Sequence, residues 1–152
     1  MPRWSCAAAV ASARVRAADF FMGPGVDITR MTVLEPGDLL TTIRIPSTFA
    51  GASFYFEKVA DRNAWDFPLV NVAAAFRVSG GRIEQARIVC GGVECVPRRL
   101  THVEELVTGR ARDEETAELA GAAAVEGTKP LNQNHFKIPL MRNLVKRAVR
   151  GA

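Results

Sequence analysis

Residues 69–93, LVNVAAAFRVSGGRIEQARIVCGGV, decide the fold, because two alternating apolar runs flank a pair of glycines. Side chains of a strand point alternately to opposite faces, so each run predicts a half-buried strand. Gly80 and Gly81 supply the backbone freedom that a tight turn needs, and the second run then returns antiparallel to the first. The predicted inward side chains are Val70, Val72, Ala74, Phe76 and Val78 on the first strand, and Ala86, Ile88 and Cys90 on the second.

A third strand is predicted immediately upstream, at residues 54–59. Its alternation places Phe54, Phe56 and Lys58 on one face, and we expect the two phenylalanines to point at the core. An ammonium on that face has to meet an anion or escape at the strand end. Lys58 is therefore the most unusual position of the chain, and the residues alone leave both outcomes open.

Downstream of Pro97 the apolar period changes to that of helices. Thr101 with Glu104 fits a capping box before a short helix that Gly109 closes. Asp113 is the expected N-cap of a second helix that runs to Gly127, and a third covers residues 140–150. Its apolar stripe consists of Met141, Leu144, Val145, Ala148 and Val149. Strands followed by helices predict an α+β domain, with an antiparallel sheet of about three strands packed against about three helices.

The region before the third strand has its own pattern. The turn sequence Glu35–Asp38 precedes residues 39–45, LLTTIRI, for which we predict a β-strand. A stretch rich in Pro, Ser, Gly and Ala over residues 46–53 then marks a boundary. We expect one segment at 1–46 and one complete domain at 53–152.

Composition narrows the class of protein. The chain has 152 residues, 48% hydrophobic and 24% charged, which is typical of a globular domain. No stretch approaches the roughly 20 apolar residues that cross a bilayer. Cys6, Cys90 and Cys95 are too few and too scattered for a disulfide framework or a zinc site. The alanine-rich start only faintly resembles a secretory signal, so we expect a cytoplasmic chain.

Local charge leaves two interpretations open. The formal net charge is +4, and no acid follows Glu126, so the C-terminal segment is basic. Such a segment is typical of a solvated helix face, and it is also compatible with nucleic-acid binding. His102 and His135 stand without partners that would make a catalytic set. Arg62 and Asp66, four residues apart, could pair with each other in the loop after Lys58, and such a surface pair is worth only about 0–1 kcal/mol.

Several short motifs occur in an order that resembles one known family. They are DFFMGP at 19–24, TVLEPGDLL at 32–40, IRIP at 43–46, FEK at 56–58, VNVAAA at 70–75, IVCGGV at 88–93, PRR at 97–99, EELVTG at 104–109 and LVKRA at 144–148. Together they resemble the C-terminal part of the FAD-binding medium subunit of the xanthine dehydrogenase, carbon monoxide dehydrogenase and aldehyde oxidoreductase family. WDFPLV at 65–70 is most similar to the bacterial aldehyde oxidoreductase branch.

The resemblance implies both a fold and a role. Residues 1–46 would be the truncated end of the FAD-binding (PCMH-type) domain, and residues 53–152 a CO dehydrogenase flavoprotein C-terminal-like domain. The implied function is electron transfer in a molybdenum hydroxylase, from iron–sulfur clusters through FAD to an acceptor. Leu40 would contact FAD through its backbone or apolar side chain, and Lys58 would be a polar contact near the flavin. Arg62 and Asp66 would shape the following loop without touching the cofactor.

The resemblance also implies partners and a limit. The molybdenum cofactor and the [2Fe–2S] clusters are expected on a large molybdenum subunit and a small iron–sulfur subunit. The family's glycine-rich loops, which wrap the FAD pyrophosphate, find no counterpart in this sequence, so we expect the chain alone to bind FAD weakly or not at all. Two alternatives remain: a docking module of the same complex that carries no flavin, and a small basic nucleic-acid-binding α+β protein.

Overall fold

The computed structural model describes residues 13–151, and the alanine-rich start and Cys6 lie outside this range. The chain divides after Asp38 into two compact units, which are considered separately below. Within the described range, none of the helices combines the length and the apolar character needed to cross a membrane.

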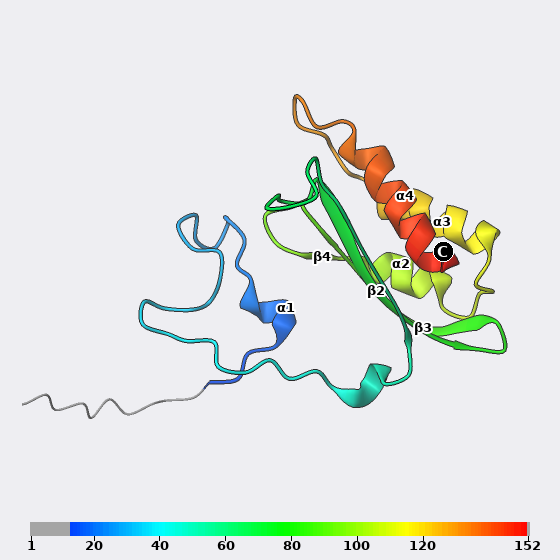
Figure 1. The fold of residues 1–152 in the computed structure, drawn as a ribbon, viewed down its shortest axis with the longest axis horizontal. Helices are drawn as coiled ribbons and strands as arrows, with labels where there is room; N and C mark the ends of the chain where they lie inside the picture. Colours follow the sequence, from blue (N-terminus) through cyan, green and yellow to red (C-terminus); the bar gives the residue numbers. More distant parts are fainter. Residues whose placement is uncertain (1–12, 152) are drawn as a thin grey trace, which may run out of the picture. The chain divides into compact units, whose positions relative to one another are not determined.

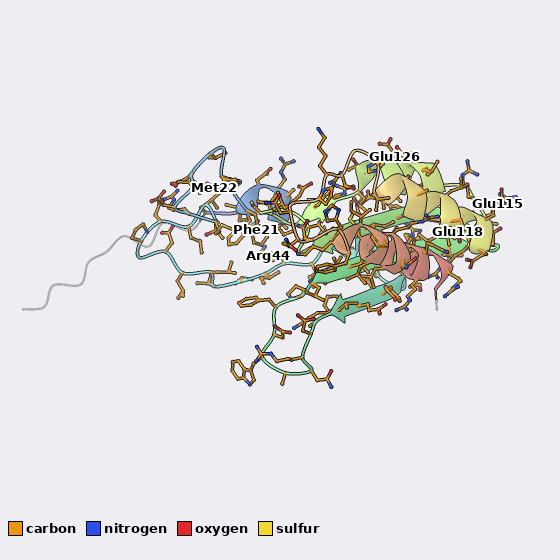
Figure 2. The ribbon with its side chains drawn as sticks, turned by 90° about the horizontal axis from the view of Figure 1, so that it is seen from above. Phe21, Met22, Arg44, Glu115, Glu118 and Glu126 are labelled. Carbon is orange, nitrogen blue, oxygen red and sulfur yellow. The ribbon has the colours of Figure 1, made fainter. Side chains whose placement is uncertain are left out.

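The described part of the first unit is a short helix followed by a narrow loop. Helix α1 spans Ala17–Phe20. Phe21 then forms an isolated antiparallel bridge with Thr32, next to a hydrogen bond of 3.0 Å from the Met22 N–H to the Met31 carbonyl. Phe21 and Met22 are labelled in Figure 2. The loop between the bridged residues is therefore closed at its base by main-chain bonds.

The second unit begins with an extended segment at residues 39–45, and here the prediction of a β-strand is wrong. Leu39, Ile43 and Ile45 are each more than three quarters exposed. A strand needs a hydrogen-bonded neighbour, and the described residues pair none with this segment. The alternation that suggested a strand is present, but a partner is not. A short 3-10 helix, η1 (Ser47–Phe49), follows.

The rest of the unit is built on a four-stranded antiparallel sheet (Figure 1). Its strands are β1 (Ser53–Val59), β2 (Val70–Ser79), β3 (Arg82–Gly91) and β4 (Arg98–Arg99), in the spatial order β1-β2-β3-β4. The predicted hairpin is the centre of the sheet, with Gly80 and Gly81 at positive φ in its turn. The short β4 was not predicted, because two residues are too few to show an alternating pattern.

Only one face of the sheet is buried. Val70, Val72 and Phe76 on β2 are fully buried, as predicted, and so are their counterparts on β3, namely Ala86, Ile88 and Cys90. Val78 is the exception: a bulge between Arg77 and Val78 shifts the register, and its side chain is 40% exposed. The hairpin thus supplies the sheet side of the core.

The prediction for the facing of β1 is wrong. Tyr55 and Val59 pack against the core, whereas Phe54 and Phe56 are 69% and 68% exposed on the opposite face. Lys58 lies on that same outer face and is exposed. The period of two was correct, but the two sides of the strand carry similar apolar content, so the aromatic side chains did not identify the inner side.

Three helices cover the buried face, as expected for the predicted α+β class. They are α2 (Thr101–Val107), α3 (Glu114–Ala124) and α4 (Lys137–Arg150), and Figure 1 shows α3 and α4 running side by side. The five residues of the predicted apolar stripe on the last helix are all buried in the core. That agreement reflects the strong 3.6-residue period of this segment.

The two predicted N-caps had different outcomes. Asp113 caps α3 as expected, accepting a hydrogen bond of 2.9 Å from the Thr116 N–H. The capping box of α2 is wrong, because no side chain caps its N-terminus and the Glu104 carboxylate bonds elsewhere. Thr101 and Glu104 have the spacing of a capping box. The Glu104 carboxylate instead accepts from the Ile88 N–H and the Arg99 guanidinium.

Helices α3 and α4 approach each other closely at Gly121. A Cβ atom on this residue would lie 2.9 Å from the Arg142 carbonyl oxygen and 2.5 Å from the Lys146 Cγ. Beside this contact Glu118 of α3, labelled in Figure 2, forms ion pairs with Arg142 and Lys146 of α4. Absence of a side chain at one position therefore sets the distance between the helices.

A single guanidinium fastens the end of α4. Arg112 donates 2.9 Å to the Val149 carbonyl and 3.1 Å to the Ser53 hydroxyl, and it stacks on the Phe76 ring at 5.0 Å. Burial lowers the pKa of Arg112. A cation at this place is favourable because the last carbonyls of a helix carry partial negative charge.

Gly121→Val is expected to destabilise the fold by about 1–3 kcal/mol, because the added side chain must push α4 away from α3. The loss should occur although valine has a better helix propensity than glycine. Urea unfolding monitored by circular dichroism measures it. Ala122→Val is the matched control, since Ala122 is the next residue of the helix and is exposed. Equal shifts of the unfolding midpoint in both variants would contradict the close approach.

Candidate functional site

The outer face of the sheet, opposite the three α-helices of the second unit, carries the most unusual surface of this unit. Its residues form three rows across the strands, set by the pairings of β1 with β2 and of β2 with β3. The rows are Phe54–Ala75–Arg87, Phe56–Ala73–Val89 and Lys58–Asn71–Gly91. Small side chains on β2 therefore lie between phenylalanines on β1 and larger residues on β3, which hollows the face along its middle.

The hollow has a volume of about 500 Å³ and opens widely to solvent. Alanines of β2 form its floor and the two phenylalanines of β1 form one wall, with Arg87 of β3 on the other side. Contiguous apolar surface of this kind is uncommon on the outside of a domain and usually marks a binding surface. The outer face is thus able to hold a flat apolar group beside a cation.

A buried carboxylate fixes the cation of the hollow. Glu104 accepts hydrogen bonds of 3.0 Å from the Ile88 N–H, 2.9 and 2.7 Å from the Arg99 guanidinium, and 3.2 Å from Arg87. Arg87 also lies over the Phe49 ring at 5.6 Å. The orientation of Arg87 is therefore set from both sides. Sequence reasoning missed this role of Glu104, and no spacing in the sequence signals it, because its partners lie on other elements.

The surroundings of the Glu104 carboxylate favour its ionised form. Burial tends to raise the pKa of Glu104, but hydrogen bonds from Arg99 and the Ile88 N–H, with the charges of Arg99 and Arg87, outweigh it and lower this pKa. Strand β4 pairs only with Val89 and Cys90 of β3. At the next residue, Ile88, the Glu104 carboxylate accepts the main-chain N–H in place of a neighbouring strand.

The predicted site residue Lys58 stands near the end of β1 and is the first member of the third row. Its Nζ donates a hydrogen bond of 2.6 Å to the main-chain carbonyl of Asp66. The Asp66 carboxylate in turn accepts from the Arg62 N–H at 2.9 Å, and lies 3.8 Å from the Arg62 guanidinium. The predicted pair of Arg62 and Asp66 is confirmed. The ammonium is not inside the core, so the inward-facing lysine of the sequence analysis is corrected to an outward-facing one.

The second predicted site residue, Leu40, is half exposed in the extended segment before η1. Arg44 of the same segment is labelled in Figure 2. Neither Leu40 nor Lys58 lines the hollow. The structure therefore places Lys58 on the hollow's face of the sheet without joining it to Leu40, and the contact of each with FAD stays a prediction.

Other candidate groups contribute no second site. His102 bonds the Ala123 carbonyl at 3.0 Å and so links α2 to the end of α3. Cys90 is buried and Cys95 exposed, and burial raises the pKa of the Cys90 thiol to about 11. Among residues 13–151 no three His, Cys, Asp or Glu side chains gather in a way that could hold a metal ion.

Comparison with known proteins agrees with this fold. Residues 55–152 match the CO dehydrogenase flavoprotein C-terminal domain. The chain belongs to this family. The FAD-binding subunit of the aldehyde oxidoreductase of Escherichia coli is 32% identical over 130 residues, 82% of this chain and 36% of that protein. The carbon monoxide dehydrogenase medium chain of Afipia carboxidovorans is 28% identical over 142 residues, 91% of this chain and 47% of that protein.

Solved structures of the family show the same architecture. A chain of the carbon monoxide dehydrogenase of Hydrogenophaga pseudoflava, in the form that lacks the Mo-pyranopterin moiety, matches with a TM-score of 0.75 and 28% identity. That match covers 89% of this chain and 46% of the other. The resemblance to a flavoprotein subunit and the predicted α+β fold are thereby confirmed. The chain spans about half the length, or less, of these members of the CO dehydrogenase flavoprotein family.

Glu104→Gln is expected to cost about 2 kcal/mol of stability at neutral pH, because an amide cannot match the charge-assisted bonds from the two arginines. A carboxylate whose pKa is lowered on folding stabilises above its ordinary value and loses that contribution as the pH falls. The difference between wild type and variant should therefore shrink below pH 4.5, the ordinary glutamate value. Unfolding curves across pH measure it. Glu105→Gln, on the exposed side of α2, is the control, and a gap that does not change with pH would contradict this account.

Proposed function

We propose that the chain acts as part of the flavin subunit of a molybdenum hydroxylase, passing electrons from iron–sulfur clusters through FAD to an acceptor. The observation that carries the proposal is the family match over residues 55–152, which includes Lys58 at the end of β1. Relatives with FAD-binding or medium-chain names share this domain. The proposed electron-transfer role rests on the family resemblance, and the geometry alone does not indicate it.

The outer sheet face supports the proposal in physical terms. When bound, FAD would supply the one- and two-electron chemistry, and the protein would supply binding, orientation and charge. The exposed phenylalanines of β1 offer an apolar surface that water solvates poorly, and Lys58 stands on the same face. An ammonium donates strong hydrogen bonds to acceptors that carry negative charge. We assign Lys58 to the polar edge of the flavin and Leu40 to an apolar contact.

The boundaries and partners are also part of the proposal. We propose that residues 1–46 are the end of an FAD-binding domain and that residues 53–152 form the flavoprotein C-terminal domain. The expected partners are a molybdenum-binding subunit and an iron–sulfur subunit, which would hold the molybdenum cofactor and the [2Fe–2S] clusters. The outer apolar face is consistent with a domain that works in contact with others.

The nucleic-acid alternative loses its main support. The basic residues of α4 that it would use are paired, since Lys146 and Arg150 both meet Glu114, and Arg147 meets Glu57 at 2.6 Å. Such pairing reduces the free positive charge that phosphate binding requires. The C-terminal cations therefore hold α4 to α3 and β1, which favours the structural interpretation of the basic segment.

Purified alone, the chain is expected to bind FAD weakly or not at all. In the family, backbone N–H groups of glycine-rich loops neutralise the pyrophosphate of FAD, and this sequence has no counterpart of those loops. Titration of FAD with the chain, followed by flavin fluorescence and the visible spectrum, tests this. A tight, stoichiometric yellow complex would refute it.

The proposal predicts that the chain, isolated from the cells that make it, co-purifies with molybdenum and iron–sulfur subunits and that this complex shows a flavin spectrum. Lys58→Gln should weaken flavin retention roughly tenfold or more, because one charge-assisted hydrogen bond is lost. Lys129→Gln, at an exposed lysine, is the matched control. Co-purification without flavin would instead support the docking module, and the absence of both partners and flavin would reject the proposal.

A further inference from the structure

We propose that Asp66 is a positioning residue for Lys58. Its carboxylate folds the loop at residues 60–69, and its main-chain carbonyl then holds the Lys58 ammonium at the outer sheet face without neutralising it. The relevance of this to flavin rests on the proposed function. The positioning itself rests only on the contacts of the loop.

The first step is the use of the Asp66 carboxylate within the loop. One oxygen accepts from the Arg62 N–H at 2.9 Å, and the other lies 3.8 Å from the Arg62 guanidinium. The guanidinium also donates to the Trp65 carbonyl at 3.2 Å. The Asp66 side chain is only 19% exposed, whereas that of Arg62 is 71% exposed. The carboxylate is therefore turned toward the loop backbone, and a short ring of bonds closes between residues 62 and 66.

The second step is the direction of the Asp66 carbonyl. Trp65, which precedes it, has φ of 52°, in the left-handed region that a residue other than glycine seldom adopts. The Asp66 carbonyl that follows points back to the end of β1, where it accepts from Lys58. The base of the loop is closed by a bond of 2.7 Å from the Leu69 N–H to the Val59 carbonyl. The unfavourable backbone angle is thus maintained by bonds on both sides of it.

The third step concerns charge. An ammonium has three N–H donors, and the Asp66 carbonyl uses one of those of Lys58. In the part of the chain that the structure describes, Lys58 forms no salt bridge. It bonds the main-chain carbonyl of Asp66, whereas the Asp66 carboxylate pairs with Arg62. Lys146 differs, since it meets the carboxylates of Glu114 and Glu118. Lys58 therefore keeps its charge and two donors available.

A cation that is fixed and unpaired has a chemical use. Reduction of a flavin adds negative charge to the ring, and a nearby ammonium that is already oriented stabilises that charge without reorganisation. If the loop carboxylate instead bonded Lys58, the pair would be close to neutral and this effect would be lost. A main-chain carbonyl orients the ammonium of Lys58 and leaves its positive charge unneutralised, whereas a salt bridge within the loop would orient it and neutralise it.

The test is the side-chain NMR signal of Lys58 in the ¹⁵N-labelled chain, assigned by its disappearance in Lys58→Arg. The hydrogen-bonded ammonium of the wild type should give a signal separate from those of freely rotating lysines. Asp66→Ala should abolish this separation, and Asp66→Asn, which keeps an acceptor oxygen, should restore it. Asp61→Ala, which removes a neighbouring exposed acid of the loop, is the control. An unchanged Lys58 signal in Asp66→Ala would overturn the proposal.

A second variant keeps the test decisive if the alanine variant does not fold. Arg62→Pro removes the N–H that the Asp66 carboxylate accepts while leaving Asp66 itself in place. It should release Lys58 in the same way, and a retained signal in a folded Arg62→Pro chain would equally contradict the proposal. Circular dichroism confirms that the sheet and helices are intact in each variant.

A measurement of the flavin midpoint potential in the isolated complex tests the role of Lys58 at the flavin separately from its positioning by Asp66. Lys58→Gln and Asp66→Ala should both lower the flavin midpoint potential, and Asp66→Asn should return it toward the wild-type value. If only Lys58→Gln lowers the potential, the influence of Asp66 on the flavin is overturned while the proposed function stands. If the NMR signal changes as expected but neither variant alters the potential, the positioning stands and the assignment of Lys58 to the flavin fails.

Discussion

One-sided burial of the sheet is the constraint on which the other features of the second unit depend. Fully buried side chains such as Val72, Phe76 and Ile88 all project from one face, where α2 and α4 lie against the sheet and α3 packs on these two helices. Because the helices occupy that face, every second residue of each strand is left on the other. The alternation that builds the core therefore also creates the surface with Phe54, Phe56 and Lys58, so stability and binding are divided between the two sides of the same strands.

The sequence predicted best where the pattern was long and chemically uneven. The hairpin of β2 and β3 alternates strongly between apolar and polar residues, and α4 separates apolar from cationic residues, so their inner faces were found correctly. On β1 the two faces carry Phe54 and Phe56 against Tyr55 and Val59, and a difference so small cannot decide which one is buried. The facing of β1 depends on tertiary contacts with α4 that no local pattern contains.

The errors at residues 39–45 and at Glu104 have a related cause. A strand and a capping box are both defined by the partners of backbone groups, and those partners lie elsewhere in the chain. The first segment has the right alternation with no neighbour, and Glu104 has the right spacing with stronger donors on β3 and β4. For the candidate site, the pairing of Arg62 with Asp66 followed from local spacing, whereas the carbonyl that holds Lys58 could not be read from side-chain types.

The attachment of Arg112 has a consequence for the order in which the chain folds. Its bonds to Val149 and Ser53 span 37 and 59 residues, whereas the hairpin of β2 and β3 joins neighbouring segments. Closing long loops costs more chain entropy than closing short ones, so contacts between distant segments tend to form after local ones. The hairpin is thus suited to act as an early nucleus. Docking of β1 and the last turn of α4 would then complete the native state together, joined through one side chain.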